Sequence, residues 1–264
     1  MRAPNHALPH SRAVPHTGAT SWPRLLLGLA VVYAIFDRMA SALGSDRGQA
    51  GLVVGGVVVA AVLAAERLLL GEPPAAAARA LGMGRPIARG LLAAAGVSLL
   101  LLLVFPVFAA VTGTGLALRQ GWTWLLPGLF APAGLAEEVL FRGYLFRRVR
   151  AGRSFWRAVA LASLPFVAVH LVLFLTMPWP VAVAAVLLSA ILSAPLAYLF
   201  ELGGGTVWAP ALLHFVIQGA IKVVTPEGPP APLLPLAWMA ASAVLPFLVF
   251  LVPRRPRAGA GSER

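Results

Sequence analysis

Apolar residues recur along the chain in long runs that begin at Trp22. An α-helix needs roughly 20 such residues to cross about 30 Å of hydrocarbon. Most of the runs are long enough, and they lie at about 22–43, 51–70, 87–112, 122–147, 154–175, 180–201, 206–224 and 232–252. The pattern predicts an all-α, polytopic transmembrane bundle of about eight helices.

The positions of Lys and Arg between these runs predict the orientation. Residues 1–21 contain Pro, His, Arg and Ser without apolar periodicity and are predicted to be a disordered tail. If this tail is cytosolic, most arginines fall in cytosolic segments, and the opposite side holds only Arg38, Arg47, Arg119 and Lys222. The positive-inside rule therefore places both termini in the cytosol. We expect a multi-pass domain over 22–252 in the plasma (cytoplasmic) membrane, followed by a basic cytosolic tail over 253–264.

Composition excludes several other classes of protein. Hydrophobic residues make up 59% of the chain and charged residues 11%, whereas about a quarter of a soluble domain is charged. The net charge of +12 is dispersed between apolar runs, which favours anionic lipid headgroups as partners and not nucleic acid. Because the chain has no cysteine, any metal would need histidine and carboxylate ligands.

The fourth run contains ionisable residues at membrane depth, namely Glu137, Glu138 and Arg142. Each costs roughly 2.5–3.5 kcal/mol on insertion scales, so such groups normally face a bundle interior or a wet cavity. Glu138 and Arg142 are four residues apart and should meet on one helix face. Glu137 lies about 100° further around an α-helix and is free to point at something else.

Outside the N-terminal tail, the chain has only two histidines, His170 in the fifth run and His214 in the seventh. Phe166 precedes His170 by one helical turn, and Gln218 follows His214 by one turn. Counted from the cytosolic ends of their spans, Glu137, His170 and His214 all fall near the midplane. The sequence therefore predicts one buried reaction centre built from three spans.

Such a set of residues is suited to amide hydrolysis. A carboxylate activates water as a general base, a histidine shuttles the proton, and an imidazole or amide N–H stabilises the oxyanion. Glu137, His170 and His214 are also candidate ligands for a divalent metal such as Zn²⁺, with one open position, although the HExxH spacing is missing. Two alternatives from other classes remain open: a proton- or ion-coupled transporter, and a catalytically silent membrane scaffold.

Three motifs resemble those of the CPBP family, the CAAX proteases and bacteriocin-processing enzymes also called the Abi family of intramembrane proteases. Residues 137–142 look like its EExxxR motif, 166–170 like FxxxH, and 214–218 like HxxxN, within a core of roughly 122–224. The resemblance implies an eight-helix core and an endopeptidase that cleaves a membrane-associated or processed peptide. It further implies Glu137 and His170 as activators of water, His214 and residue 218 as oxyanion donors, and Glu138 and Arg142 as a supporting pair.

One position departs from the family pattern, because Gln218 stands where the family has Asn. The glutamine keeps the same donors, but its extra methylene moves them by about a bond length. This departure is what favours the silent-scaffold alternative. The sequence has no visible prenyl-recognition feature, so the expected substrate is a peptide or protein at the membrane, whether prenylated or not.

Overall fold

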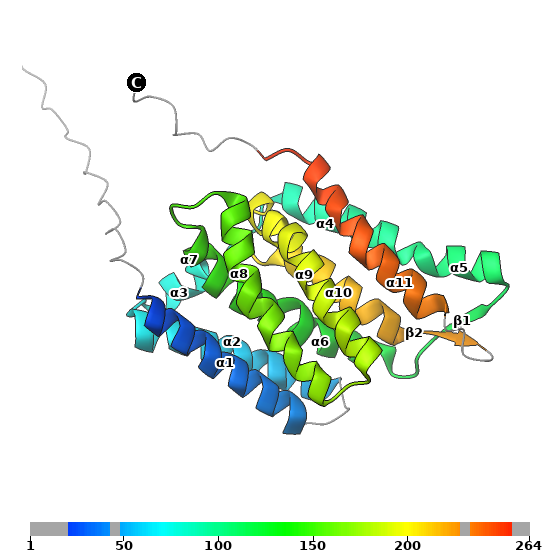
Figure 1. The fold of residues 1–264 in the computed structure, drawn as a ribbon, viewed down its shortest axis with the longest axis horizontal. Helices are drawn as coiled ribbons and strands as arrows, with labels where there is room; N and C mark the ends of the chain where they lie inside the picture. Colours follow the sequence, from blue (N-terminus) through cyan, green and yellow to red (C-terminus); the bar gives the residue numbers. More distant parts are fainter. Residues whose placement is uncertain (1–20, 43–47, 228–232, 255–264) are drawn as a thin grey trace, which may run out of the picture.

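The computed structural model describes residues 21–42, 48–227 and 233–254, which form a helical bundle with one small sheet (Figure 1). The predicted N-terminal tail lies outside the described residues except for Ser21, as does the predicted C-terminal tail except for Pro253 and Arg254. In the described ranges, seven helical segments are long and apolar enough to cross a membrane. The predicted polytopic helical bundle is confirmed.

The seven segments correspond to seven of the eight predicted spans. They are Trp22–Ala42, Gln49–Leu70, Ala88–Thr112, Trp122–Arg150, Phe155–Leu175, Trp179–Leu202 and Leu233–Leu251. The remaining predicted span, 206–224, forms the shorter apolar helix α10 (Trp208–Val223). Because α10 is buried among other helices, most of its surface needs no contact with lipid.

The first half of the chain forms α1 to α5. Their bounds are α1 Trp22–Ala42, α2 Gln49–Leu70, α3 Pro74–Ala80, α4 Ala88–Leu102 and α5 Val104–Thr112. In the second half, several spans combine helical types, as in α6 Trp122–Leu129, η1 Phe130–Ala136, η2 Val139–Phe146 and α7 Arg147–Arg150. The rest are α8 Phe155–His170, η3 Leu171–Leu175, α9 Trp179–Leu202, α10, α11 Leu233–Val244 and η4 Leu245–Leu251.

Helix α10 lies near the middle of the bundle and contacts α4, α9 and η1 (Figure 1). Helices α1 and α2 lie on one side of it, and α4, α5 and α11 lie on the other. The span formed by α6, η1, η2 and α7 runs beside α2 and α10. This span carries Glu137, α10 carries His214 and Gln218, and α8 carries His170, so the candidate site lies in the interior of the bundle.

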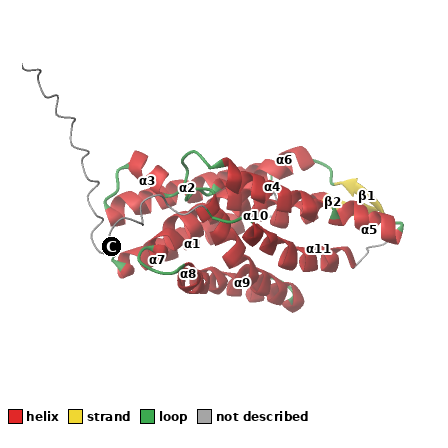
Figure 2. Cartoon of the chain, turned by 90° about the horizontal axis from the view of Figure 1, so that it is seen from above, coloured by secondary structure: helices red, strands yellow, loops and turns green. Residues whose placement is uncertain are grey.

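A two-stranded antiparallel sheet lies at one end of the molecule, opposite α3 and α7 (Figure 2). It pairs β1 (Gly115–Leu118) with β2 (Val224–Glu227), so that Leu118 faces Val224. The N–H of Arg119 extends the pairing by donating to the Val223 carbonyl at 2.8 Å. Strand β1 leads into α6 and β2 leaves α10, so the sheet joins the ends of these two helices.

Small residues bring α2 close to the span that carries the glutamates. Gly51 and Gly55 are one turn apart on α2. A Cβ built on Gly51 would lie 2.0 Å from the Gly128 carbonyl oxygen, and one built on Gly55 would lie 2.6 Å from the Ala131 carbonyl carbon. Apolar lipid gives helices no hydrophobic reason to associate, so such close backbone approach is how they gain van der Waals contact.

Ion pairs fill the end of the bundle opposite the sheet. Glu66 is fully buried and accepts two hydrogen bonds from Arg148, at 2.7 and 2.5 Å. Glu201 pairs with Arg150 at 2.6 Å and with Arg254 at 2.7 Å. Several arginines that the sequence assigned to cytosolic segments are thus bound by carboxylates of the protein itself.

The close contact of α2 can be tested with two adjacent glycines. Gly55→Ala forces a methyl group into the Ala131 backbone and should destabilise the protein by roughly 1–3 kcal/mol. Gly56→Ala meets nothing within 4 Å and should leave stability unchanged or slightly raise it. Thermal unfolding in detergent compares the two, and equal midpoints would contradict the close packing of α2 on Ala131.

Candidate active site

The helix that carries the two glutamates is not a regular α-helix. Its hydrogen bonds are π-helical over Phe130–Ala136 and again over Val139–Phe146, on either side of Glu137 and Glu138. Pro132 has no N–H and cannot complete an α-helical ladder, and its carbonyl accepts from the Glu137 N–H five residues later. The α-helical geometry expected for this span is therefore wrong in these segments. Single π-helical turns are frequent at functional sites.

Glu138 is the centre of a buried polar cluster. Its Oε1 accepts hydrogen bonds from Arg142 Nη1 at 3.0 Å and from His214 Nδ1 at 2.7 Å. Glu138 is fully buried, and Arg142 and His214 are 3% and 1% exposed. The predicted pairing of Glu138 with Arg142 is present, and the contact with His214 brings α10 to the same carboxylate. A buried carboxylate needs such partners, because an uncompensated charge would be costly at this depth.

Glu137 lies on the other side of the same imidazole. Its Oε2 is 3.8 Å from His214 Nε2. This oxygen is buried and, within the described ranges, has no hydrogen-bond partner. Because His214 uses Nδ1 toward Glu138, its Nε2 is the nitrogen that faces Glu137. Two polar atoms thus face each other across a gap slightly longer than a hydrogen bond.

The ring of Phe166 lies near both predicted histidines and Arg142. It lies 5.0 Å from the His170 ring and 6.4 Å from the His214 ring, measured between centroids. The Arg142 guanidinium lies over the same ring at 4.5 Å from its centroid. The predicted packing of Phe166 beside His170 is present, and both imidazoles flank one phenyl ring although they come from different helices.

His170 is the last residue of α8, where the chain changes to the 3₁₀ turns of η3. Its Nδ1 lies 2.7 Å from the Phe166 carbonyl oxygen, which assigns the proton to Nδ1 and leaves Nε2 as the acceptor in the neutral ring. Tyr33 on α1 donates to the neighbouring Val169 carbonyl at 2.8 Å. Sequence reasoning missed Tyr33, although a phenol within an apolar run is a signal that could have singled it out.

Gln218 lies one turn beyond His214 on α10, as its spacing predicts. Its Oε1 accepts a hydrogen bond from Lys222 Nζ at 3.4 Å. The carboxamide oxygen is thus turned toward Lys222. The NH₂ group is the part of Gln218 that remains to donate elsewhere.

The metal alternative depends on whether Glu137, His170 and His214 come together around one point. Over these parts of the chain, no group of three or more His, Asp or Glu side chains is placed to hold one metal ion. Glu137 and His214 face each other, and the Nδ1 of His170 is directed at a backbone carbonyl, which leaves Nε2 as its possible ligand atom. The metal alternative stays a prediction, because a catalytic zinc site needs three protein ligands around one point and the described side chains as placed do not provide them.

Comparison with known proteins gives one finding. The family model of the Rce1-like type II CAAX prenyl endopeptidases matches residues 119–220, which is less than half of the chain. The matched segment runs from the residue after β1 to near the end of α10 and contains all three motifs. No curated protein and no solved structure matches the chain.

The matched segment contains Glu137, His170 and His214, the residues on which the resemblance was based. The seven long apolar helices fit a protease whose site lies within the membrane. The predicted resemblance to the CAAX proteases is thus confirmed over residues 119–220, which match the Rce1-like type II CAAX prenyl endopeptidase model, and the match supports an intramembrane endopeptidase in general.

Proposed function

We propose that this protein hydrolyses a peptide bond of a membrane-associated substrate with a water molecule activated by Glu137. The observation that carries the proposal is the gap of 3.8 Å between Glu137 Oε2 and His214 Nε2, where the carboxylate oxygen is buried and lacks a partner among the described residues. A water molecule to one side of these two atoms would lie within hydrogen-bond reach of both.

In the proposed first step, the Glu137 carboxylate takes a proton from this water as its oxygen attacks the scissile carbonyl carbon. The carbonyl oxygen becomes an oxyanion. The imidazolium form of His214 would donate from Nε2 to that oxyanion while Nδ1 stays bonded to Glu138. The Gln218 NH₂ group supplies a second donor.

In the second step, the C–N bond breaks and the proton held by Glu137 passes to the leaving nitrogen. The products are a carboxylic acid and an amine, so atoms and charge balance without a covalent enzyme intermediate, and Glu137 returns to its carboxylate form. His170, whose Nε2 is an acceptor in the neutral ring, is proposed to relay protons. Glu138 orients the His214 ring by accepting from Nδ1 and compensates the charge of its imidazolium form, and Arg142 holds the Glu138 carboxylate in place.

The proposal includes the topology that the sequence predicted. We place both termini on the cytosolic side of the cytoplasmic membrane, because most arginines lie at the end of the bundle that contains Glu66 and Glu201. The Rce1-like match favours a protease over the transporter alternative. The proposed substrate is a peptide or protein at the membrane. The assay described next tests cleavage with and without a prenyl group.

Removing the general base is the direct test. Glu137→Gln in the purified full-length protein should lower kcat for a CAAX reporter peptide by about 10²–10⁴-fold, because the amide cannot take the proton. The exposed Glu227 is the matched control, and Glu227→Gln should keep wild-type activity. The peptide is assayed with and without a farnesyl group. Unchanged kcat in Glu137→Gln would reject the assigned base.

Gln218 distinguishes an active enzyme from a silent scaffold. Gln218→Ala should lower kcat by about 10²–10³-fold, because one oxyanion donor is lost. Gln218→Asn should retain cleavage, since the same NH₂ group is present. Cleavage rates of the two variants against the same peptide provide the measurement. A wild-type protein that cuts neither form of the peptide, together with an equally inactive Gln218→Asn variant, would support the scaffold.

Metal dependence can be tested separately. Because Glu137, His170 and His214 do not converge as ligands, cleavage should persist after dialysis against EDTA and 1,10-phenanthroline. Metal content is measured on the same sample. A loss of activity that returns on adding Zn²⁺ would contradict the mechanism based on water and Glu137 and would favour the metal alternative.

A further inference from the structure

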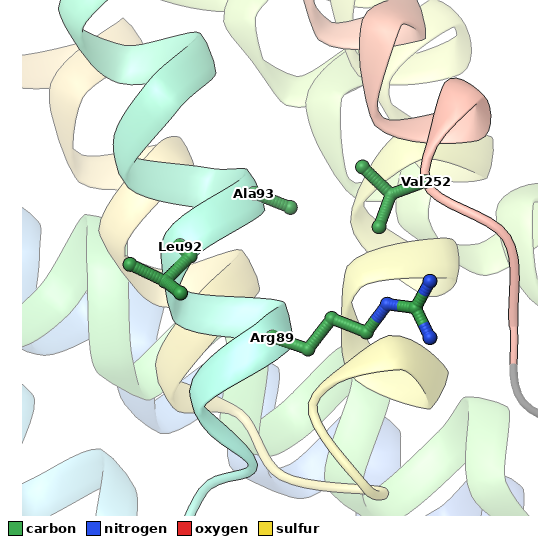
Figure 3. Close-up of a pocket in the computed structure, with 4 residues that line it drawn as sticks. All are labelled: Arg89, Leu92, Ala93 and Val252. Carbon is green, nitrogen blue, oxygen red and sulfur yellow. The ribbon is translucent and has the colours of Figure 1, made fainter.

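An open groove of about 540 Å³ lies between the beginning of α4 and the end of η4. It is lined by Arg89, Leu92, Ala93 and Val252 (Figure 3). Ala93 and Val252 point toward each other from opposite walls, and the Arg89 side chain extends across the space between them. The groove is thus apolar with one cation at its end, and it is separate from the catalytic cluster.

Arg89 differs from three other arginines near this end of the bundle. Arg148, Arg150 and Arg254 are each bound by Glu66 or Glu201. Arg89 forms no hydrogen bond or ion pair with any of the residues that the structure describes. Its guanidinium, with five donors in a planar fork, is suited to a phosphate group. Unlike those three arginines, Arg89 therefore combines an apolar groove with a guanidinium that no carboxylate of the described chain neutralises.

The walls of the groove are fixed in place. The Ile87 N–H donates to the Gly203 carbonyl at 3.2 Å, and a Cβ on Gly90 would lie 2.6 Å from Gly203, so the start of α4 is packed against the end of α9. On the other wall, the Val252 carbonyl accepts from the Tyr198 hydroxyl at 2.6 Å. A ligand would therefore meet a preformed site.

The position of the groove relative to the bilayer indicates what kind of molecule fits it. Arg89 lies in the first turn of the apolar segment Ala88–Thr112, which places its charge at the level of the lipid headgroups. Leu92 is 72% exposed and lies further into the span. A cation at headgroup level above an apolar wall matches a molecule with an anionic head and a hydrocarbon tail.

We propose that this groove binds an anionic phospholipid. The phosphate pairs with Arg89, and an acyl chain lies against Leu92, Ala93 and Val252. The dispersed net charge predicted anionic lipid headgroups as partners without assigning a site. Since Arg148 and Arg150 are bound by carboxylates, the proposal assigns the lipid contact to Arg89 on α4.

The test is native mass spectrometry of the full-length protein released from detergent and titrated with dioleoyl phosphatidylglycerol or dioleoyl phosphatidylcholine. Wild-type protein should bind one phosphatidylglycerol more tightly than phosphatidylcholine. Arg89→Gln should weaken phosphatidylglycerol binding about five- to tenfold, the effect of one arginine near anionic lipid. Arg67→Gln is the matched control, because Arg67 is exposed at the end of α2, and it should bind as wild type does.

A second variant separates the groove from the charge. Ala93→Trp fills the space between the walls and should weaken binding of both lipids, while Arg89→Glu should reverse the preference between them. Unfolding midpoints identify any variant that has lost its fold. If Ala93→Trp or Arg89→Glu has unfolded, lipid binding by Arg89→Gln decides the outcome, because this substitution alters only a side chain in the groove. Equal losses in Arg89→Gln and Arg67→Gln, or displacement of the lipid by inorganic phosphate, would overturn the proposal. Because lipid binding is measured without cleavage, its failure leaves the protease proposal unaffected.

Discussion

The buried carboxylate of Glu138 is the interaction on which the interior of this protein depends. It accepts from Arg142 on its own helix and from His214 on α10, while the Arg142 guanidinium also lies against Phe166 on α8. Three helices are thus joined through one charged group. Removing one partner of a buried ion pair typically costs about 3–5 kcal/mol, because the other charge is left without compensation. Any role of His214 in chemistry therefore depends on the same contacts that hold the helices together.

Steric fit between small residues makes this polar cluster possible. Gly51 and Gly55 allow α2 to approach the backbone of the glutamate-bearing span. Gly134 does the same on the opposite side, where a Cβ would lie 3.0 Å from the Ala211 carbonyl oxygen of α10. Helices this close leave little space for water or lipid around Glu138. The exclusion of both is what makes its hydrogen bonds strong and its isolation costly.

The sequence predicted the spans and the meeting of local pairs, because hydropathy and helical spacing are properties of contiguous residues. Glu138 with Arg142 and Phe166 with His170 are both separated by four residues, and both pairs are in contact. The contact of Glu66 with Arg148 could not be predicted in this way, since 82 residues separate the partners. Tyr33 and Val169 are separated by 136 residues. Such pairs are determined by how the helices pack.

The π-helical turns were missed for a different reason. Hydrophobic periodicity shows which residues are apolar but not whether a carbonyl bonds four or five residues ahead. Pro132 was a local signal that an α-helical bond would be lost. The orientation of the bundle and the roles of Glu137, His170, His214 and Gln218 stay predictions, because they concern a membrane and a substrate and not the fold.

The small sheet links the span that carries Glu137 to α10, which carries His214. Since β1 enters α6 and β2 leaves α10, these helices are connected at one end by main-chain hydrogen bonds and deeper in the bundle by Glu138 and His214. The two helices are therefore linked at two separate places along their length. These two sets of contacts restrain the helices relative to each other, so the separation of Glu137 and His214 is set by the backbone pairing of the sheet as well as by the side chains between them.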